Sequence, residues 1–139
     1  MVDFEEKLLD FYIKDYEINW HCYQMMGKLL NKRKVKERKE LYNLESLYIY
    51  GGGYLGIQLY NALDGITDIK AVVDKNGSLC MDIDDIRAIT FDELKKEYSD
   101  EKIIVTPVKY YQAIWEDLSG FADKDNLLFL GEFLEGIVL

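Results

Sequence analysis

The fold of this chain is decided by residues 47–56, which read Leu47-Tyr48-Ile49-Tyr50-Gly51-Gly52-Gly53-Tyr54-Leu55-Gly56. The first four residues form a short apolar run, which is typical of a buried strand. Three glycines follow, and a fourth lies inside a helix that we predict over residues 54–63. A glycine-rich loop that follows a strand and opens a helix has the context that a phosphate-binding loop requires.

Outward from this stretch, short apolar runs alternate with amphipathic helices. We predict further strands at residues 69–74, 86–89, 102–106 and 126–130, helices after Thr90 and at residues 109–118, and a short tail from Gly131. Such alternation predicts a parallel sheet with right-handed crossovers and helices on both faces. We therefore expect an α/β, Rossmann-like three-layer sandwich whose five-stranded parallel sheet has the order 3-2-1-4-5.

Residues 1–45 are predicted to form a helical extension to a nucleotide-binding domain of residues 46–139. Apolar side chains recur every three or four residues over residues 3–30, at Phe4, Leu8, Phe11, Tyr12, Tyr16, Trp20, Tyr23, Met26 and Leu30. We expect this broad face of one helix to pack on its own domain or on a second copy of the chain. The basic run at 32–39 is interpreted as a solvated helix face, which could also pair with the acidic domain or with a second copy.

The charge distribution limits the class of partner. The chain has 17 basic and 26 acidic residues, a net charge of −9, and residues 1–45 contain nine of each, so residues 46–139 hold the whole excess. This balance argues against nucleic acid or an anionic membrane as the main partner, because both require a basic surface. Cys22 and Cys80 are unclustered, and no apolar run is long enough to span a bilayer. We therefore expect reduced thiols, no membrane span and a cytoplasmic location.

Each glycine of the loop has an expected task. Gly51 allows the tight turn, Gly53 lets a phosphate approach the backbone, and Gly56 lets the helix pack closely on the strand. The N–H groups at the start of the helix then face the anion, and the helix dipole favours negative charge there. An acidic protein would thus hold a phosphate with backbone amides instead of lysines.

Two further strand ends are expected beside this loop. Asp74 ends the second strand, 18 residues after Gly56, and its carboxylate is placed either to accept hydrogen bonds from ribose hydroxyls or to close a turn. An acid here disfavours a 2′-phosphate. Thr106-Pro107 ends the fourth strand, either lining the crevice or only closing the strand. The predicted binding residues are Gly51, Gly52, Gly53, Tyr54, Leu55, Gly56, Asp74, Thr106 and Pro107.

Catalytic residues are not assigned. His21 is the only histidine, which excludes a histidine metal cluster or a Ser-His-Asp triad within one chain, and we interpret it as a packed or exposed helix residue. No P-loop motif occurs. The acidic residues Asp82, Asp84 and Asp85 are interpreted as a solvated loop, so no metal is expected.

Four segments carry a resemblance: residues 48–56, 71–76, 89–94 and 103–107. Together they resemble the Rossmann-like domains of bacterial surface-polysaccharide biosynthesis over about residues 47–130. These are the N-terminal sugar-nucleotide-binding domain of sugar acetyltransferases, the CoA-binding-like domain of nucleotide-sugar dehydratases, and the Rossmann domain of sugar C-methyltransferases. The resemblance implies that the glycine loop and Asp74 hold a nucleotide or nucleotide sugar. The chain lacks the β-helix and catalytic histidine of the acetyltransferases and the catalytic domain of the dehydratases.

The sequence therefore predicts a nucleotide- or nucleotide-sugar-binding module, accessory to bacterial cell-surface glycan synthesis, with NAD or a nucleotide sugar as its ligand. Its expected protein partner is a second copy, bound through the N-terminal helix, or a separate catalytic subunit. Two alternatives stay open. One is a small NAD-dependent oxidoreductase or a subunit of one, with tyrosines or Asp74 as acid and base. The other is an interaction domain that has lost its ligand.

Overall fold

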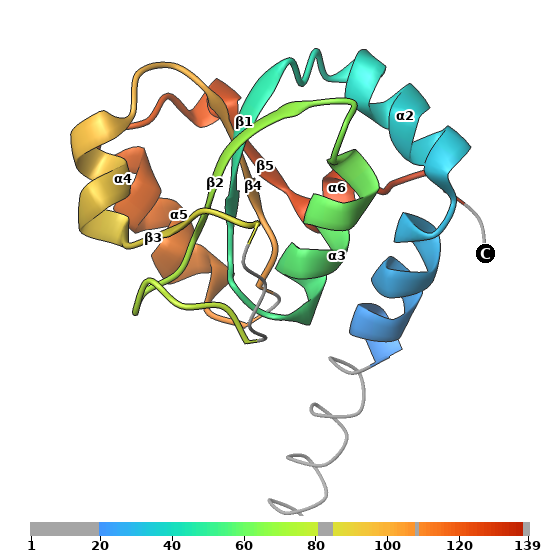
Figure 1. The fold of residues 1–139 in the computed structure, drawn as a ribbon, viewed down its shortest axis with the longest axis horizontal. Helices are drawn as coiled ribbons and strands as arrows, with labels where there is room; N and C mark the ends of the chain where they lie inside the picture. Colours follow the sequence, from blue (N-terminus) through green and yellow to red (C-terminus); the bar gives the residue numbers. More distant parts are fainter. Residues whose placement is uncertain (1–19, 81–84, 108, 138–139) are drawn as a thin grey trace, which may run out of the picture.

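The computed structural model describes residues 20–80, 85–107 and 109–137 (Figure 1). Its centre is a five-stranded, all-parallel sheet with the order β3-β2-β1-β4-β5. The strands are β1 (Ser46–Tyr50), β2 (Asp68–Val73), β3 (Ala88–Ile89), β4 (Lys102–Val105) and β5 (Leu127–Phe129). The predicted class and strand order are confirmed, and the order reverses between β1 and β4.

The helices lie on both faces of the sheet. They are α2 (Lys32–Leu41), α3 (Tyr54–Leu63), α4 (Phe91–Glu97), α5 (Tyr111–Ser119), the 3₁₀ turn η1 (Lys124–Asn126) and α6 (Leu130–Phe133), and residues 20–29 are also helical. In Figure 1, α4 and α5 cover one face, and α2, α3 and α6 lie on the other side. This is the three-layer arrangement expected of alternating strands and helices.

Two buried clusters fill the spaces between the layers, because side chains alternate across a strand. Leu47 and Ile49 of β1 point to the cluster that contains α3, α6 and residues 29–44. Tyr48 points to the opposite cluster, with Leu94 of α4 and Leu118 of α5. Central strands buried on both faces explain why β1 and β4 read as unbroken apolar runs.

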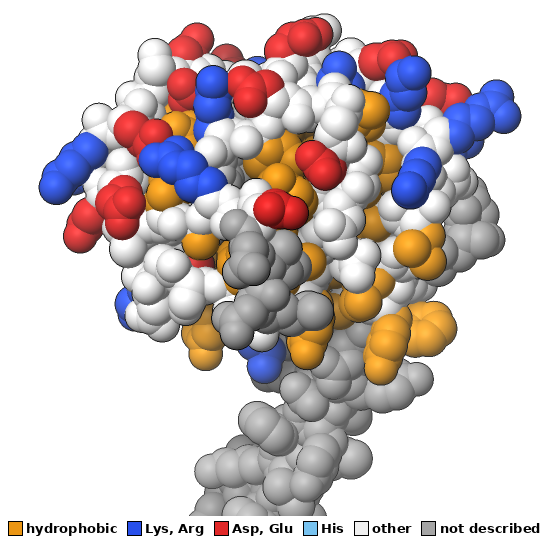
Figure 2. Space-filling model, in the orientation of Figure 1, with side chains coloured by type: hydrophobic (Ala, Val, Ile, Leu, Met, Phe, Trp, Pro, Cys, Tyr) orange, Lys and Arg blue, Asp and Glu red, His pale blue; other side chains and the backbone are white. Residues whose placement is uncertain are grey.

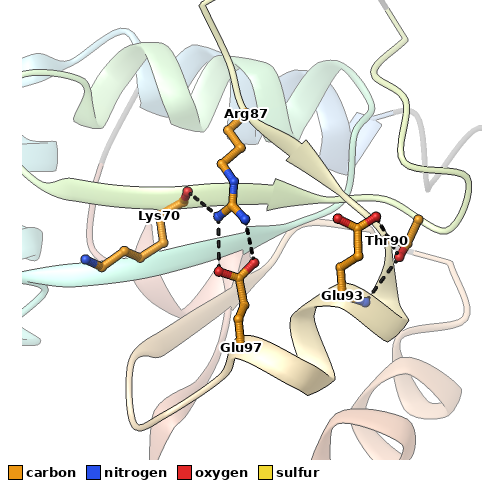
Figure 3. Close-up of polar contacts among 5 residues, drawn as sticks. All are labelled: Lys70, Arg87, Thr90, Glu93 and Glu97. Atoms are coloured by element: carbon orange, nitrogen blue, oxygen red, sulfur yellow. Dashed lines mark hydrogen bonds and ion pairs between the residues drawn. The ribbon is translucent and has the colours of Figure 1, made fainter.

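The short edge strand β3 is fastened by side chains. Arg87 donates to both carboxylate oxygens of Glu97 at 2.9 and 3.2 Å and to the carbonyl of Lys70 at 3.4 Å (Figure 3). The Thr90 hydroxyl accepts from the Glu93 N–H at 3.2 Å and so caps α4. These contacts hold α4 against a strand of two paired residues, which is shorter than the predicted 86–89.

The described part of the N-terminal helix ends close to its predicted end, but its apolar stripe does not pack mainly on its own domain, which was one of the two expected alternatives. Residues 3–19 lie outside the described residues, and the helix ends before Asn31, whose side chain caps α2 by accepting from the Lys34 N–H at 3.2 Å. Met25 and Leu29 pack on the domain core. The stripe expected to pack is largely on the outside, because Trp20, Tyr23 and Leu30 are 53%, 71% and 76% exposed.

The basic run is a solvated helix face with one exception. Arg33 and Lys34 are exposed and form ion pairs with Glu37 on the same helix. Arg38 instead reaches the other end of the chain, where its Nε donates to the carbonyl of Phe133 at 2.8 Å and its Nη2 to that of Glu132 at 3.1 Å. The basic residues of the run therefore pair with an acidic residue of their own helix and with backbone carbonyls of α6.

The short tail predicted from Gly131 is wrong. Residues 130–133 form α6, because Leu130, Phe133 and Leu134 are buried at helical spacing against the cluster below β1. Among the described residues, no helix has the length and apolar character needed to cross a membrane.

Candidate functional site

The turn after β1 requires glycine at its first and last positions, Gly51 and Gly56, and also at Gly52. Gly51 has φ +120°, and its N–H donates to the carbonyl of Val73 at 2.7 Å. A Cβ on Gly51 would collide with Oγ1 of Thr106 and lie 3.0 Å from Cδ of Pro107. A Cβ on Gly56 would collide with the carbonyl oxygen of Gly51. The first glycine thus closes the turn and the last lets α3 pack on it, which are the structural tasks expected of them.

Gly52 is covered by the segment that follows β2. A Cβ on Gly52 would lie 2.8 Å from the carbonyl oxygen of Ser78 and 3.1 Å from Oδ1 of Asp74. The Gly52 carbonyl accepts from the Cys80 N–H at 2.8 Å. The loop after β2 therefore lies against the middle of the glycine loop.

Gly53 is different, because no contact among the described residues requires a glycine there. Its φ is −82°, which any residue adopts, and a Cβ would meet no atom of the described residues within 4 Å. Gly53 is exposed and is the N-cap of α3, with no side chain capping the helix. The amides of the first turn, which a helix leaves without intrahelical partners, thus begin at a position kept clear of side chains.

Asp74 closes a turn, which is one of the two alternatives that its sequence context left open. Its Oδ2 accepts from the Asn76 N–H at 3.0 Å, which closes the turn after β2. Its Oδ1 lies on the side of Gly52. The carboxylate is half-buried beside the glycine loop, where it can meet a ligand held by that loop.

Thr106 has a structural task. It is 3% exposed, and both its N–H and its hydroxyl donate to the carbonyl of Tyr50, at 3.0 and 2.9 Å. The hydroxyl proton is thereby committed to β1, so Thr106 ties the two strands together where the sheet order reverses. Pro107 packs against Gly51. The structure thus brings the glycine loop, Asp74, Thr106 and Pro107 together at the carboxyl edge of the sheet.

The two remaining predicted binding residues, Tyr54 and Leu55, lie in different environments: Leu55 packs on the core and Tyr54 is exposed. The side chain of Leu55 packs on the core, so only its backbone amide faces the start of α3. Tyr54 is 63% exposed next to Gly53. Its ring therefore lies outside the core, at the mouth of the loop.

A cavity of about 700 Å³ adjoins this edge on the side of β4 and β5. One wall is the helix 20–29, and the floor is formed by the carboxyl ends of β4 and β5. Its lining residues are His21, Gln24, Met25, Lys28, Val105, Thr106, Pro107, Tyr111, Phe129, Leu130, Gly131 and Leu134. Thr106 and Pro107 are common to the cavity and to the packing of the glycine loop.

Sequence reasoning missed the N-terminal wall of this cavity. His21 is exposed on its helix, as expected, but lies on the cavity and not far from the proposed site. His21, Gln24 and Lys28 follow one another at spacings of three and four residues, which places them on one helix face. That polar stripe could have indicated a ligand-facing side of the helix. The aromatic stripe beside it has the same helical spacing and predicts packing instead.

Aromatic rings form the far side of the cavity. Tyr111 lies edge-on to Phe129 with ring centres 5.2 Å apart, and Trp115 stacks on the same ring at 4.6 Å. Tyr110, just before α5, has φ +60° and is 81% exposed. A left-handed conformation is costly for a side chain of this size.

Tyr50, which ends β1 at the crevice, is a poor base. Burial, followed by the charges of Asp117 and Asp74, raises the pKa of Tyr50, so its hydroxyl stays protonated at neutral pH. Tyr98 and Lys102 have the Tyr-x-x-x-Lys spacing of a dehydrogenase proton-transfer pair. They lie at the amino edge of the sheet, where the Tyr98 hydroxyl donates to the carbonyl of Glu101 at 2.9 Å.

Cysteines and acids add no further centre in the described part of the chain. Cys22 and Cys80 are free thiols, and burial raises the pKa of Cys22, partly opposed by Lys109. No three His, Cys, Asp or Glu residues among those described are grouped to hold a metal ion. Asp82 and Asp84 lie outside the described residues.

Comparisons with known protein families, with curated proteins and with solved structures found no match to this chain. The likeness to Rossmann-like domains of surface-glycan synthesis therefore rests on the four sequence segments that carry it.

Proposed function

We propose that this chain is a binding module for a nucleoside diphosphate compound, a nucleotide sugar or NAD, with the diphosphate at the start of α3. The observation that carries the proposal is Gly53. Among the described residues, neither its φ nor its packing requires a glycine, unlike the other glycines of the loop, and it stands at the exposed N-terminus of a ten-residue helix. A phosphate that approaches the backbone supplies the missing reason for a glycine there.

The local chemistry supports the same ligand class. The domain holds the whole negative excess of the chain, so an anion needs a site made from oriented amides and a helix dipole. Asp74 flanks the loop on the β2 side and suits ribose hydroxyls as acceptor. Its charge disfavours a 2′-phosphate, which favours NAD or a nucleotide sugar over NADP.

Calorimetry and thermal unfolding with UDP, dTDP, ADP, GDP, their glucose derivatives and NAD test the proposal. A ligand at 100 times its Kd should stabilise the fold by about 2.7 kcal/mol. The matched variants are Gly53→Asp and Gly53→Asn, which place side chains of equal size in open space. We expect Asp to weaken binding about tenfold or more beyond Asn, because its charge opposes the phosphate. Equal affinity of both variants and the native chain would overturn the proposal, and so would the absence of any stabilising nucleotide.

The binding module is preferred over the small oxidoreductase. Tyr50, the tyrosine that ends β1, is kept protonated by burial, and the Tyr98–Lys102 spacing falls at the opposite edge. Turnover of NADH with a nucleotide sugar by the purified chain would reverse this preference. We place the module in bacterial surface-glycan synthesis on the strength of the motif resemblance.

The exposed apolar face of helix 20–29 supports self-association. Trp20, Tyr23 and Leu30 leave large apolar surfaces in solvent, and Figure 2 shows hydrophobic side chains gathered at the lower right, on the side of this helix. We propose that this face meets a second copy of the chain, because burying such rings is favourable. Sedimentation equilibrium should show a dimer that Tyr23→Glu dissociates, while Glu135→Gln, a change on an exposed residue elsewhere, leaves it intact. A native monomer at all concentrations would exclude this pairing.

A further inference from the structure

We propose that the cavity between helix 20–29 and the ends of β4 and β5 receives the part of the ligand beyond the diphosphate, a sugar that carries an anionic group. This inference rests on the proposed nucleotide binding at Gly53 and adds the chemistry of the ligand's distal half. The first argument is position. Thr106 and Pro107 line the cavity and also touch Gly51, so the two spaces share a wall.

The second argument is direction. Asp74 lies on the β2 side of the glycine loop and the cavity lies on the β4 side. A ligand whose ribose meets Asp74 and whose diphosphate meets the start of α3 therefore continues toward the cavity. The volume of about 700 Å³ falls in the usual range of small-molecule sites, about 300–1,000 Å³.

The third argument is charge. The chain has 26 acidic residues, yet none stands among the described residues that line the cavity. Lys28 does, and within the described part of the chain no ion pair engages it. His21 and Gln24 add polar groups on the same helix face. This wall suits a carboxylate or phosphate, because hydrogen bonds to charged groups are the stronger ones.

The fourth argument is the opposite side, which is apolar and aromatic. Phe129, Leu130 and Leu134 form an apolar surface, and Tyr111 stands at its edge. A sugar has a C–H face and polar edges, so it matches a cavity with one aromatic and one donor-bearing wall. A second diphosphate or a bare anion would leave the apolar side unused.

Gly131 offers a way to close the cavity without disturbing the fold. It lines the cavity, and a Cβ there would meet no atom of the described part of the chain within 4 Å. Gly131→Phe should therefore fill the space, and Gly131→Ala is the matched control. Lys28→Gln removes the cation and keeps a side chain of similar reach.

Affinities of these four proteins for UDP, UDP-glucose and UDP-glucuronate, with ADP and NAD as a second series, test the inference. We expect UDP-glucuronate to bind the native chain tightest. Gly131→Phe should reduce its affinity to that of UDP and leave UDP itself unchanged within twofold. Lys28→Gln should weaken UDP-glucuronate about tenfold and leave UDP-glucose unchanged.

The outcomes separate the two proposals. If UDP and both of its sugars bind the native chain and Gly131→Phe equally, the cavity assignment is wrong and nucleotide binding stands. A third outcome is that NAD binds more tightly than ADP, and that this difference in affinity is lost in Gly131→Phe but kept in Lys28→Gln. In that case the cavity takes an uncharged or cationic ring, and the proposal of an anionic sugar is wrong. If no nucleotide of either series binds, both proposals fall together.

Discussion

Two connections leave the carboxyl edge of the sheet next to each other, and they are built in opposite ways. The β1–α3 loop consists of glycines, and its contacts are made by backbone: Gly51 N–H to Val73, and the carbonyl of Gly51 against Gly56. The connection after β4 is made by side chains. There Thr106 is buried with its hydroxyl spent on β1, and Tyr110 bears an unfavourable φ.

The difference separates Thr106, whose contacts the fold itself explains, from Gly53, which we propose a ligand explains. In the β4 connection the buried Thr106 hydroxyl has its partner within the protein, the carbonyl of Tyr50. In the β1 loop, Gly53 leaves the start of α3 without a side-chain cap. The helices after both connections, α3 and α5, begin without a side-chain cap, but α3 begins at an exposed glycine and α5 at a tyrosine. Four substitutions probe this contrast, in order of expected effect on stability.

Gly56→Ala should cause the largest loss. Its Cβ would overlap the Gly51 carbonyl, which is backbone and cannot move without displacing α3 from β1. Overpacking of this kind reduces the free energy of unfolding by about 3 kcal/mol. Urea unfolding monitored by circular dichroism measures it. A loss below about 1 kcal/mol would mean that the loop accommodates a side chain and that its glycines are not set by packing.

Thr106→Val should cost less. The variant keeps the shape and removes the hydroxyl that donates to Tyr50, leaving the Thr106 N–H to the same carbonyl. Loss of one buried hydrogen bond reduces the free energy of unfolding by about 1 kcal/mol. The same urea titration measures it, with Thr67→Val as a control away from this edge. If nucleotide affinity fell while stability held, Thr106 would instead belong to the ligand site.

Tyr110→Gly should stabilise the protein. The residue is 81% exposed and has φ +60°, so glycine relieves backbone strain and sacrifices little contact. The strain is about 1 kcal/mol and is partly offset by the greater freedom of glycine in the unfolded chain. A rise in melting temperature is the expected readout. A clear fall would show that the Tyr110 ring makes contacts that outweigh its conformation.

Gly53→Ser should have the smallest effect on stability and the clearest effect on binding. The serine side chain enters open space, and its hydroxyl can cap α3. A cap is worth a few tenths of a kcal/mol relative to glycine. The same hydroxyl occupies the amides proposed for phosphate, so calorimetry should find a more stable protein with weaker nucleotide affinity. A variant that gains stability and keeps its affinity would place the phosphate elsewhere.

Local patterns predicted the sheet well. The strand order and the bounds of α3 follow from apolar runs, glycine punctuation and the Thr90 cap, all of which act within a few residues. The N-terminal helix was harder, because its aromatic stripe and its polar stripe both have helical spacing. Which of them turns inward depends on the shape of the distant β4 and β5 ends, so the partial burial of Met25 and the placement of Lys28 could not be deduced locally.

Local patterns also predicted part of the candidate site, the glycine loop, but they did not predict the hydrogen bond of Thr106 or the cavity. The tasks of Gly51 and Gly56 follow from where a turn must close and a helix must pack. The commitment of the Thr106 hydroxyl depends on its neighbour β1, 56 residues earlier. The cavity depends on helix 20–29, β4, β5, α5 and α6 coming together. The α6 turn was predicted to be a tail, because a four-residue segment is too short to show a helical period.

The hydrogen bond from Arg38 to the carbonyl of Phe133 determines when α2 can complete its packing during synthesis. The two residues are 95 positions apart. At translation rates of about 5–20 residues per second, α2 waits roughly 5–20 s for its partner to be made. Val35 of α2 and Phe133 of α6 belong to one buried cluster, so this face of the sheet cannot be completed during that interval. The packing of α2 is thus completed only after all five strands, which follow it in the chain, have been made.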